Sequence, residues 1–197
     1  MHGLVNRSIQ CFVRDTYGAE AWSGICREAN LGFDNFEAML IYDDSQTETV
    51  LTAACARFDR SRAAFLEDMG TYLVTSPGLG ALRRLLRFGG DTFTEFLHTL
   101  DDLQDRMHLA LPELDAPSLE LTEHAIGTYC LRYRWSHAGF GAMILGILRA
   151  MADDYGALVV LEHRPEKRGG EDCGRIPIRL LDAKFAEGHE FAFGVAG

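Results

Sequence analysis

The sequence predicts an α+β fold, in which a helical N-terminal part is followed by a mixed part built on a four-stranded antiparallel sheet. Residues 1–110 place apolar side chains at the three- and four-residue spacing of amphipathic helices. After Pro112 the pattern changes to the two-residue alternation of strands, interrupted by one strongly apolar helical stretch. A helical region followed by a strand-rich region is typical of the α+β class.

The helical part carries clear start and stop signals. The segments Asp43-Asp44-Ser45, Asp59-Arg60-Ser61 and Asp91-Thr92 supply N-cap side chains. Ser76-Pro77-Gly78 and Gly89-Gly90 are sequences that end helices. We predict helices over residues 4–17, 19–28, 50–58, 59–74, 79–88 and 93–108.

The helix predicted over residues 93–108 presents a polar side chain on its apolar stripe. At about 100° per residue, Gln104 falls close to the direction of Phe93, Leu97 and Leu100. We therefore expect Gln104 to point inward, where a buried amide without a partner costs about 1–3 kcal/mol.

The mixed part alternates apolar and polar residues in several short segments. Strands are predicted over residues 119–123, 128–135, 158–161, 176–181 and 191–195, and a helix over 139–155. Pro177 moves the segment 176–181 toward a sheet edge, because proline lacks a backbone donor. Residues 164–174, which contain a Gly-Gly turn, are interpreted as a polar hinge.

Composition restricts the partners and the compartment. The chain has 197 residues, of which 47% are apolar, and a formal net charge of -10. One compact domain is expected, and the negative charge argues against nucleic acid or an anionic membrane as the main target. No apolar run is long enough to span a membrane, we expect no secretory signal, and five scattered cysteines are typical of reduced thiols. We expect a cytoplasmic protein.

Several segments together carry a family resemblance. Met1–Ile9, Tyr17–Trp22 and Ile41–Asp44 resemble the heme–nitric oxide/oxygen binding (H-NOX) domain, the sensor domain of soluble guanylate cyclase and of bacterial gas sensors. The match continues through Leu100–Leu103 and Leu111-Pro112 and covers nearly the whole chain. The resemblance implies one H-NOX-like domain over 1–197, with a helical distal subdomain (1–60) and a proximal subdomain that contains the sheet (61–197).

The resemblance also implies a heme site, and this chain departs from it. The family's proximal histidine, which ligates the iron, falls at Gln104, and Pro117 matches the proline that presses on the porphyrin. In the Tyr-x-Ser-x-Arg motif that clamps the propionates, Tyr133 is kept, Trp135 replaces the serine and His137 replaces the arginine. A carboxamide is a much weaker iron ligand than imidazole, and histidine lacks the fixed fork of arginine. Heme binding should therefore be greatly weakened.

Substitute roles stay open for several residues. Gln104 is either a hydrogen-bonding core residue or a weak ligand. His108, one helical turn further on, is either a surface histidine or a ligand reached by a shift of about 6 Å. His137 is either a propionate contact or a turn residue. Val5 and Ile9 match positions that line the distal face, and without a cofactor they are core residues.

Two functions follow from the resemblance. The first is a non-enzymatic, heme-binding gas sensor that prefers nitric oxide and signals to a separate histidine kinase or cyclic-dinucleotide enzyme. The alternative is a heme-free regulatory module that keeps the fold. We expect no zinc site, because the Cys-x-x-Cys spacing is missing, and the sequence contains no motif of an enzyme active site.

Overall fold

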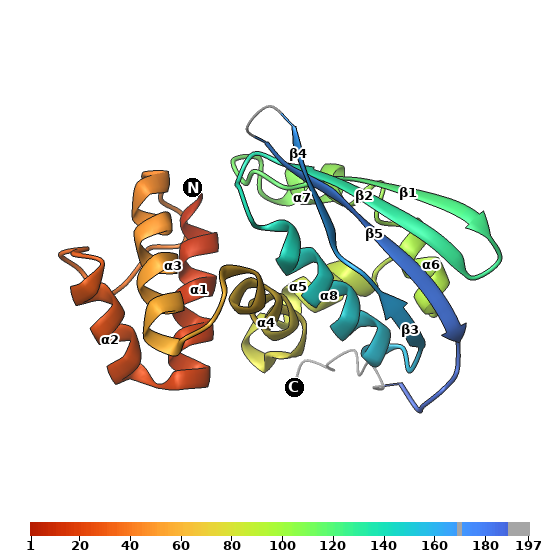
Figure 1. Cartoon of the computed structure of the whole chain (residues 1–197), viewed down its shortest axis with the longest axis horizontal. Coiled ribbons are helices and arrows are strands. Elements are labelled where there is room, and N and C mark those ends of the chain that lie inside the picture. The colour runs from red at the N-terminus through yellow and green to blue at the C-terminus, as the bar shows by residue number, and fades with distance from the viewer. Residues whose placement is uncertain (169–170, 189–197) are drawn as a thin grey trace, which may run out of the picture.

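The computed structural model describes residues 1–168 and 171–188. Three N-terminal helices stand together at one end of the molecule, and the sheet with its long helix occupies the other (Figure 1). In order, the helices are α1 (Gly3–Tyr17), α2 (Ala19–Glu28), α3 (Asp44–Phe58), α4 (Arg62–Thr75), the 3₁₀ turn η1 (Pro77–Leu79), α5 (Gly80–Arg87), α6 (Phe93–His98), α7 (Leu103–Ala110) and α8 (Gly141–Asp154). The strands are β1 (Ser118–Ala125), β2 (Thr128–Trp135), β3 (Leu158–Leu161), β4 (Arg164–Arg168) and β5 (Glu171–Asp182). The strand predicted over 191–195 lies outside the described residues.

Three helices begin at their predicted caps. The side chain of Asp43 accepts a hydrogen bond from the Ser45 amide (3.0 Å), and that of Ser61 accepts one from the Ala64 amide (3.2 Å). Thr92 and Glu95 form a reciprocal capping box at the start of α6. The α+β class and these helix starts are confirmed.

The helix predicted over residues 93–108 is wrong in one respect, because the segment forms two helices. α6 ends at His98 and α7 begins at Leu103. Arg106 donates to the Thr99 carbonyl (2.7 Å) where α6 ends and to the Leu85 carbonyl (3.4 Å) in the last turn of α5, so it satisfies acceptors that these helix ends leave open. Asp101 accepts from the Leu121 amide (2.6 Å) and ties the turn to β1.

The sheet differs from the predicted four-stranded one because it contains β4, a strand that was not predicted. Within the described residues it has five strands in the order β1-β2-β5-β3, all antiparallel, and β4 also pairs with β5. The expected hinge over 164–174 is wrong, since it forms β4 and the start of β5.

Pro177 lies in an interior strand and not at the edge that we predicted. Its carbonyl accepts from the Glu162 amide (3.3 Å), and the nitrogen of a residue points to the same side of a strand as its carbonyl. That side is where β3 ends at Leu161 and β4 begins at Arg164. The missing donor therefore faces the gap between two short partner strands.

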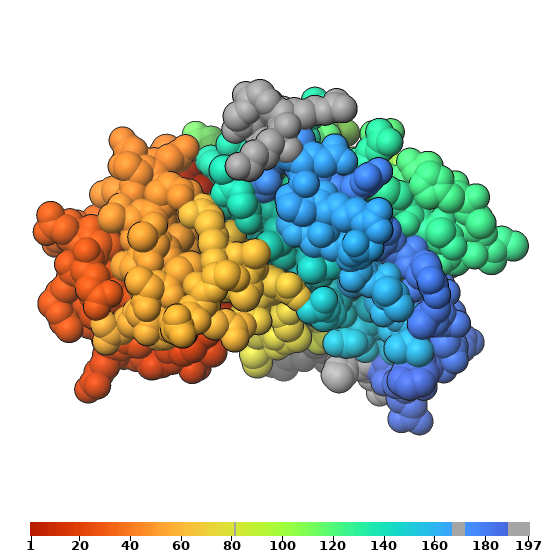
Figure 2. Space-filling model, in the orientation of Figure 1, coloured from red at the N-terminus to blue at the C-terminus, as the bar shows by residue number. Residues whose placement is uncertain are grey.

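The long helix α8 lies between α4 and the sheet and is buried along most of its length. The two helices cross closely at Gly70 and Gly146, whose absent side chains let the backbones meet. In the space-filling view (Figure 2), the red-to-orange surface of the first three helices and the green-to-blue surface of the strands form opposite ends. No helix in the described part of the chain is long and apolar enough to cross a bilayer.

Candidate functional site

An apolar cavity of about 150 Å³ lies where α1, α4, α7 and α8 meet β1 and β2. Its walls are aliphatic apart from Ser8, Asp115 and Trp135. The lining residues are Leu4, Val5, Ser8, Met69, Leu73, Leu82, Leu86, Leu100, Leu103, Met107, Leu114, Asp115, Pro117, Leu119, Leu131, Trp135, Met143, Ile144, Ile147 and Leu148.

Three residues that the resemblance singled out lie on this cavity. Val5 faces it from α1, Pro117 from the loop before β1, and Trp135 from the end of β2. Ile9 does not line it and lies fully buried in the surrounding core. The indole of Trp135 is buried and donates to the Asp115 carbonyl (3.3 Å), so it closes this side of the cavity.

The hydroxyl of Tyr133 does not face the apolar cavity, as a residue that clamps a heme propionate there would. Its buried hydroxyl forms a hydrogen bond with Nε2 of His163 (2.7 Å). A Cβ added to Gly141 would lie 2.2 Å from that hydroxyl, and one added to Gly174 would lie 2.6 Å from it. Tyr133 is therefore packed under the start of α8, away from the lining of the apolar cavity.

Burial changes the acid–base properties of this pair. Desolvation raises the pKa of Tyr133 far above its usual value, and nearby Asp172 adds to the effect. Desolvation also lowers the pKa of His163 below its ordinary value of 6.5, although Asp172 and Glu67 oppose this. Both side chains are therefore neutral around neutral pH.

Acidification will weaken the fold through His163. Its pKa is lower in the folded than in the unfolded chain, so the unfolded state takes up its proton first as the pH falls through 6.5. We expect the urea midpoint of the wild type to fall between about pH 7.5 and about pH 5.5, and that of His163→Gln to fall less. An equal fall of the urea midpoint in both proteins would contradict the assignment of this pH dependence to His163.

Gln104 does not point inward as predicted. The break between α6 and α7 rotates the second helix, so Leu103 and Met107 face the cavity and the side chain of Gln104 is exposed. Its amide nitrogen donates to the Ala116 carbonyl (3.2 Å). His108 is exposed on the same helix and is absent from the lining.

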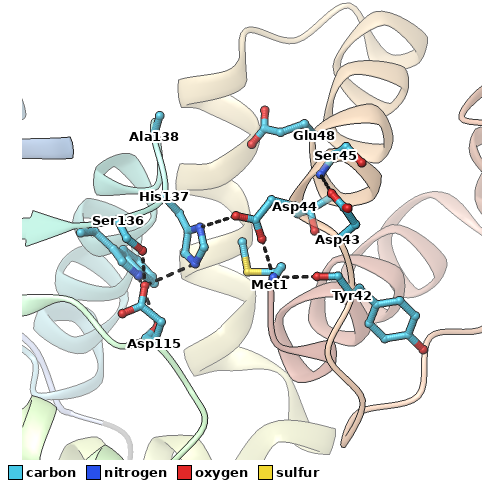
Figure 3. Close-up of polar contacts among 12 residues, drawn as sticks. Met1, Tyr42, Asp43, Asp44, Ser45, Glu48, Asp115, Ser136, His137 and Ala138 are labelled. Carbon is cyan, nitrogen blue, oxygen red and sulfur yellow. Dashed lines mark hydrogen bonds and ion pairs between the residues drawn. The ribbon is translucent and has the colours of Figure 1, made fainter. Parts of the chain in front are cut away.

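A polar cluster joins the first three helices to the rest of the molecule (Figure 3). We call Met1, Asp44, Asp115, Ser136 and His137 the His137 cluster. Nε2 of His137 lies 3.3 Å from Oδ2 of Asp115, and Nδ1 lies 3.8 Å from Oδ2 of Asp44. Asp44 pairs with the amino group of Met1, and Asp115 accepts from the Ser136 hydroxyl. Because Asp115 also lines the cavity, the cluster connects the cavity wall to the start of α3.

These residues do not fit a heme held as the family motif holds it. Among the described residues that line the cavity, none is a histidine and none carries a positive charge. The one charged side chain on the wall is Asp115, which would repel a propionate, and Trp135 occupies the position of the small hydroxyl. The described residues also contain no group of three or more metal-ligating side chains.

Sequence reasoning missed Leu103, Met107 and Asp115 as cavity residues. Leu103 and Met107 are four residues apart and mark a helical face of their own. At 100° per residue from Phe93, the inward direction is assigned to Gln104 and not to Leu103, because that phase ignores the turn between the two helices. No sequence pattern predicts that Asp115 lines the cavity, because its position depends on how the loop before β1 folds back.

Comparison with known proteins is consistent with this architecture. The Haem-NO-binding family model matches residues 2–163. Soluble guanylate cyclase 89Da of Drosophila melanogaster is 24% identical over 183 residues, which is 92% of this chain and 27% of the relative. The rat guanylate cyclase soluble subunit beta-2 is 33% identical over 92 residues, 47% of this chain and 14% of that protein. The chain thus spans about a quarter or less of these relatives.

Solved structures show the same fold. A mutant of the T. tengcongensis H-NOX has a TM-score of 0.79 at 12% identity, covering 93% of this chain and 99% of that one. An oxygen-binding H-NOX domain related to soluble guanylate cyclases has a TM-score of 0.72 at 13% identity, covering 96% and 100%. From the family match and the shared fold, this chain belongs to the Haem-NO-binding (H-NOX) family of heme-based gas-sensor domains and is homologous to the sensor domains of soluble guanylate cyclases.

Proposed function

We propose that this chain is a non-enzymatic regulatory H-NOX domain that works without a histidine-ligated heme. The observation that carries this proposal is the lining of the apolar cavity, which offers neither an imidazole for iron nor a cation for a propionate. In this proposal the state of the cavity is passed to a separate signalling protein.

The location of the cavity supports a regulatory role. Val5 of α1, Leu103 of α7 and Met143 of α8 all line the cavity, so its occupancy affects how the helices of residues 1–60 pack on those of residues 61–197. The His137 cluster bridges the same two parts at the cavity wall. A guest that separates these parts slightly shifts the population between two packings.

The second candidate is the heme-binding nitric oxide sensor with weakened ligation. It is supported by the positions of Val5 and Pro117, which line the cavity where the family's heme-facing residues are expected. Under either candidate the partner is a proposal, with a histidine kinase or a cyclic-dinucleotide enzyme as the expected class.

An absorption spectrum separates the two candidates. We expect wild-type protein produced with excess heme precursor to show no Soret band. We also expect no band in Gln104→His, because position 104 is exposed and a new imidazole there does not face the cavity. The oxygen-binding H-NOX domain of the comparison, prepared in parallel, provides the positive control.

Each other outcome has a definite meaning. A Soret band in the wild type contradicts the heme-free proposal, and its loss in His108→Ala would then identify a shifted ligand. A band that appears only in Gln104→His leaves the wild type heme-free and shows that residue 104 faces the cavity in solution.

A further inference from the structure

The outer face of the sheet, opposite α8, carries a concentration of arginines. Along β2 the inward side chains are buried, whereas Arg132 and Arg134 are exposed. Strand register places Arg175 of β5 directly opposite Arg132, and Arg164 of β4 opposite Arg175 on the other side. We call the outward positions Arg132, Arg134, Arg164, Arg175 and Arg179 the arginine face.

This arrangement is not one that stability alone would favour. Like charges directly opposite each other on neighbouring strands are destabilising. Glu166 lies 3.5 Å from Arg175, and Glu162 lies 2.6 Å from Arg164, so these two arginines are partly neutralised. With Glu120 opposite Arg132, the outward positions that the structure describes hold three glutamates and five arginines, so this part of the face is positive on a chain of net charge -10.

The arginine face also contains a polar groove of about 470 Å³. Arg132, Arg134 and Arg175 line it together with Ser118, Glu120 and Glu166. Guanidinium groups present flat forks of donors that match carboxylates, and the backbones of the neighbouring strands that carry them lie about 4.8 Å apart. The groove is therefore built for several separate carboxylates in a row.

We propose that the arginine face is a docking surface for an acidic segment of a partner protein. An extended or helical segment can place its carboxylates on Arg132 and Arg175 and leave Glu120 and Glu166 uncovered. This proposal rests on the proposed function only in taking the occupant to be the signalling partner.

The test is binding of a fluorescein-labelled polyglutamate peptide to the full chain, followed by fluorescence polarisation. We expect Arg132→Gln/Arg175→Gln to weaken binding about tenfold at low salt, since each arginine–carboxylate contact is charge-assisted. The matched control Arg60→Gln/Arg149→Gln also removes two half-exposed arginines, each from one surface ion pair, and should change binding less than about twofold.

Folding and ligand class are controlled separately. Arg132→Gln alone should keep the thermal midpoint within about 2 °C of the wild type, because its favourable and unfavourable neighbours offset each other. Equal weakening by both double variants would overturn the proposal in favour of non-specific charge attraction. Arg132-dependent binding to phosphatidylserine vesicles or inorganic phosphate, with none to polyglutamate, would overturn it in favour of another anion.

The outcome is independent of the cavity. Neither arginine lines the apolar cavity or belongs to the His137 cluster. A Soret band in the wild type would therefore overturn the heme-free function and leave the docking surface standing. Equal weakening of peptide binding by the two double variants would overturn the docking surface and leave the heme-free function standing.

Discussion

Gly146→Ala is expected to lower the free energy of unfolding by about 3 kcal/mol, at the upper end of overpacking costs. A Cβ at this position would lie 2.0 Å from the carbonyl oxygen of Glu67 and 3.0 Å from the Thr71 amide nitrogen. Both atoms belong to the backbone of α4, so no rotation of a side chain can relieve the overlap. The two helices must separate, and both of them line the apolar cavity.

Urea unfolding, followed by far-UV circular dichroism, measures this loss. Gly80→Ala is the matched control, because a Cβ at Gly80 would lie 3.5 Å from the nearest atom, the end of the flexible Arg84 side chain. Alanine is the better helix former, so this variant should be as stable as the wild type or more stable. If Gly146→Ala unfolds at the wild-type midpoint, the close crossing of α4 and α8 does not exist in solution.

Asp154→Ala is expected to have a similar effect for an electrostatic reason. Asp154 is buried at the end of α8, where its carboxylate pairs with Arg83 and, at 3.0 Å, with Nη1 of Arg87. The Arg87 guanidinium also lies 4.4 Å from the centre of the Tyr155 ring. Removing one partner of a buried pair costs about 3–5 kcal/mol, and we expect the lower end because Arg83 keeps some contact with water.

The same urea experiment on Asp154→Asn separates charge from shape. The amide keeps the volume and one acceptor oxygen. The free energy of unfolding of Asp154→Asn should therefore lie between that of the wild type and that of Asp154→Ala. If the two variants unfold at the same midpoint as the wild type, the pair is an exposed surface contact with little effect on stability.

Local chemistry made the helices predictable, and partner strands made the sheet less so. Asp43, Ser61 and Thr92 cap helices through atoms two or three residues away, so the sequence contains all that decides these starts. The first three residues of β4, Arg164, Pro165 and Glu166, are exposed. A polar strand of this kind cannot be distinguished from a loop by its sequence unless the partner strand is known. Pro177 was misplaced for the same reason.

Residues of the site could be placed from the family resemblance where their segments match the family in order and spacing. The direction of a side chain could not be predicted after the turn between α6 and α7. Val5, Pro117 and Trp135 line the cavity, and their part in holding a cofactor stays a prediction. Gln104 was misassigned because the turn between α6 and α7 depends on Asp101 bonding to β1 and on Arg106 reaching back. These are tertiary contacts, and helical periodicity does not contain them.

The position of β5 has a consequence for how the protein folds. β2, β3 and β4 all pair with this one strand, and all three come before it in the chain. During synthesis the hairpin of β1 and β2 can form early, but β3 and β4 have no partner strand until residues 171–182 emerge. Because pairings distant in sequence form slowly, closure of the sheet around β5 should set the folding rate.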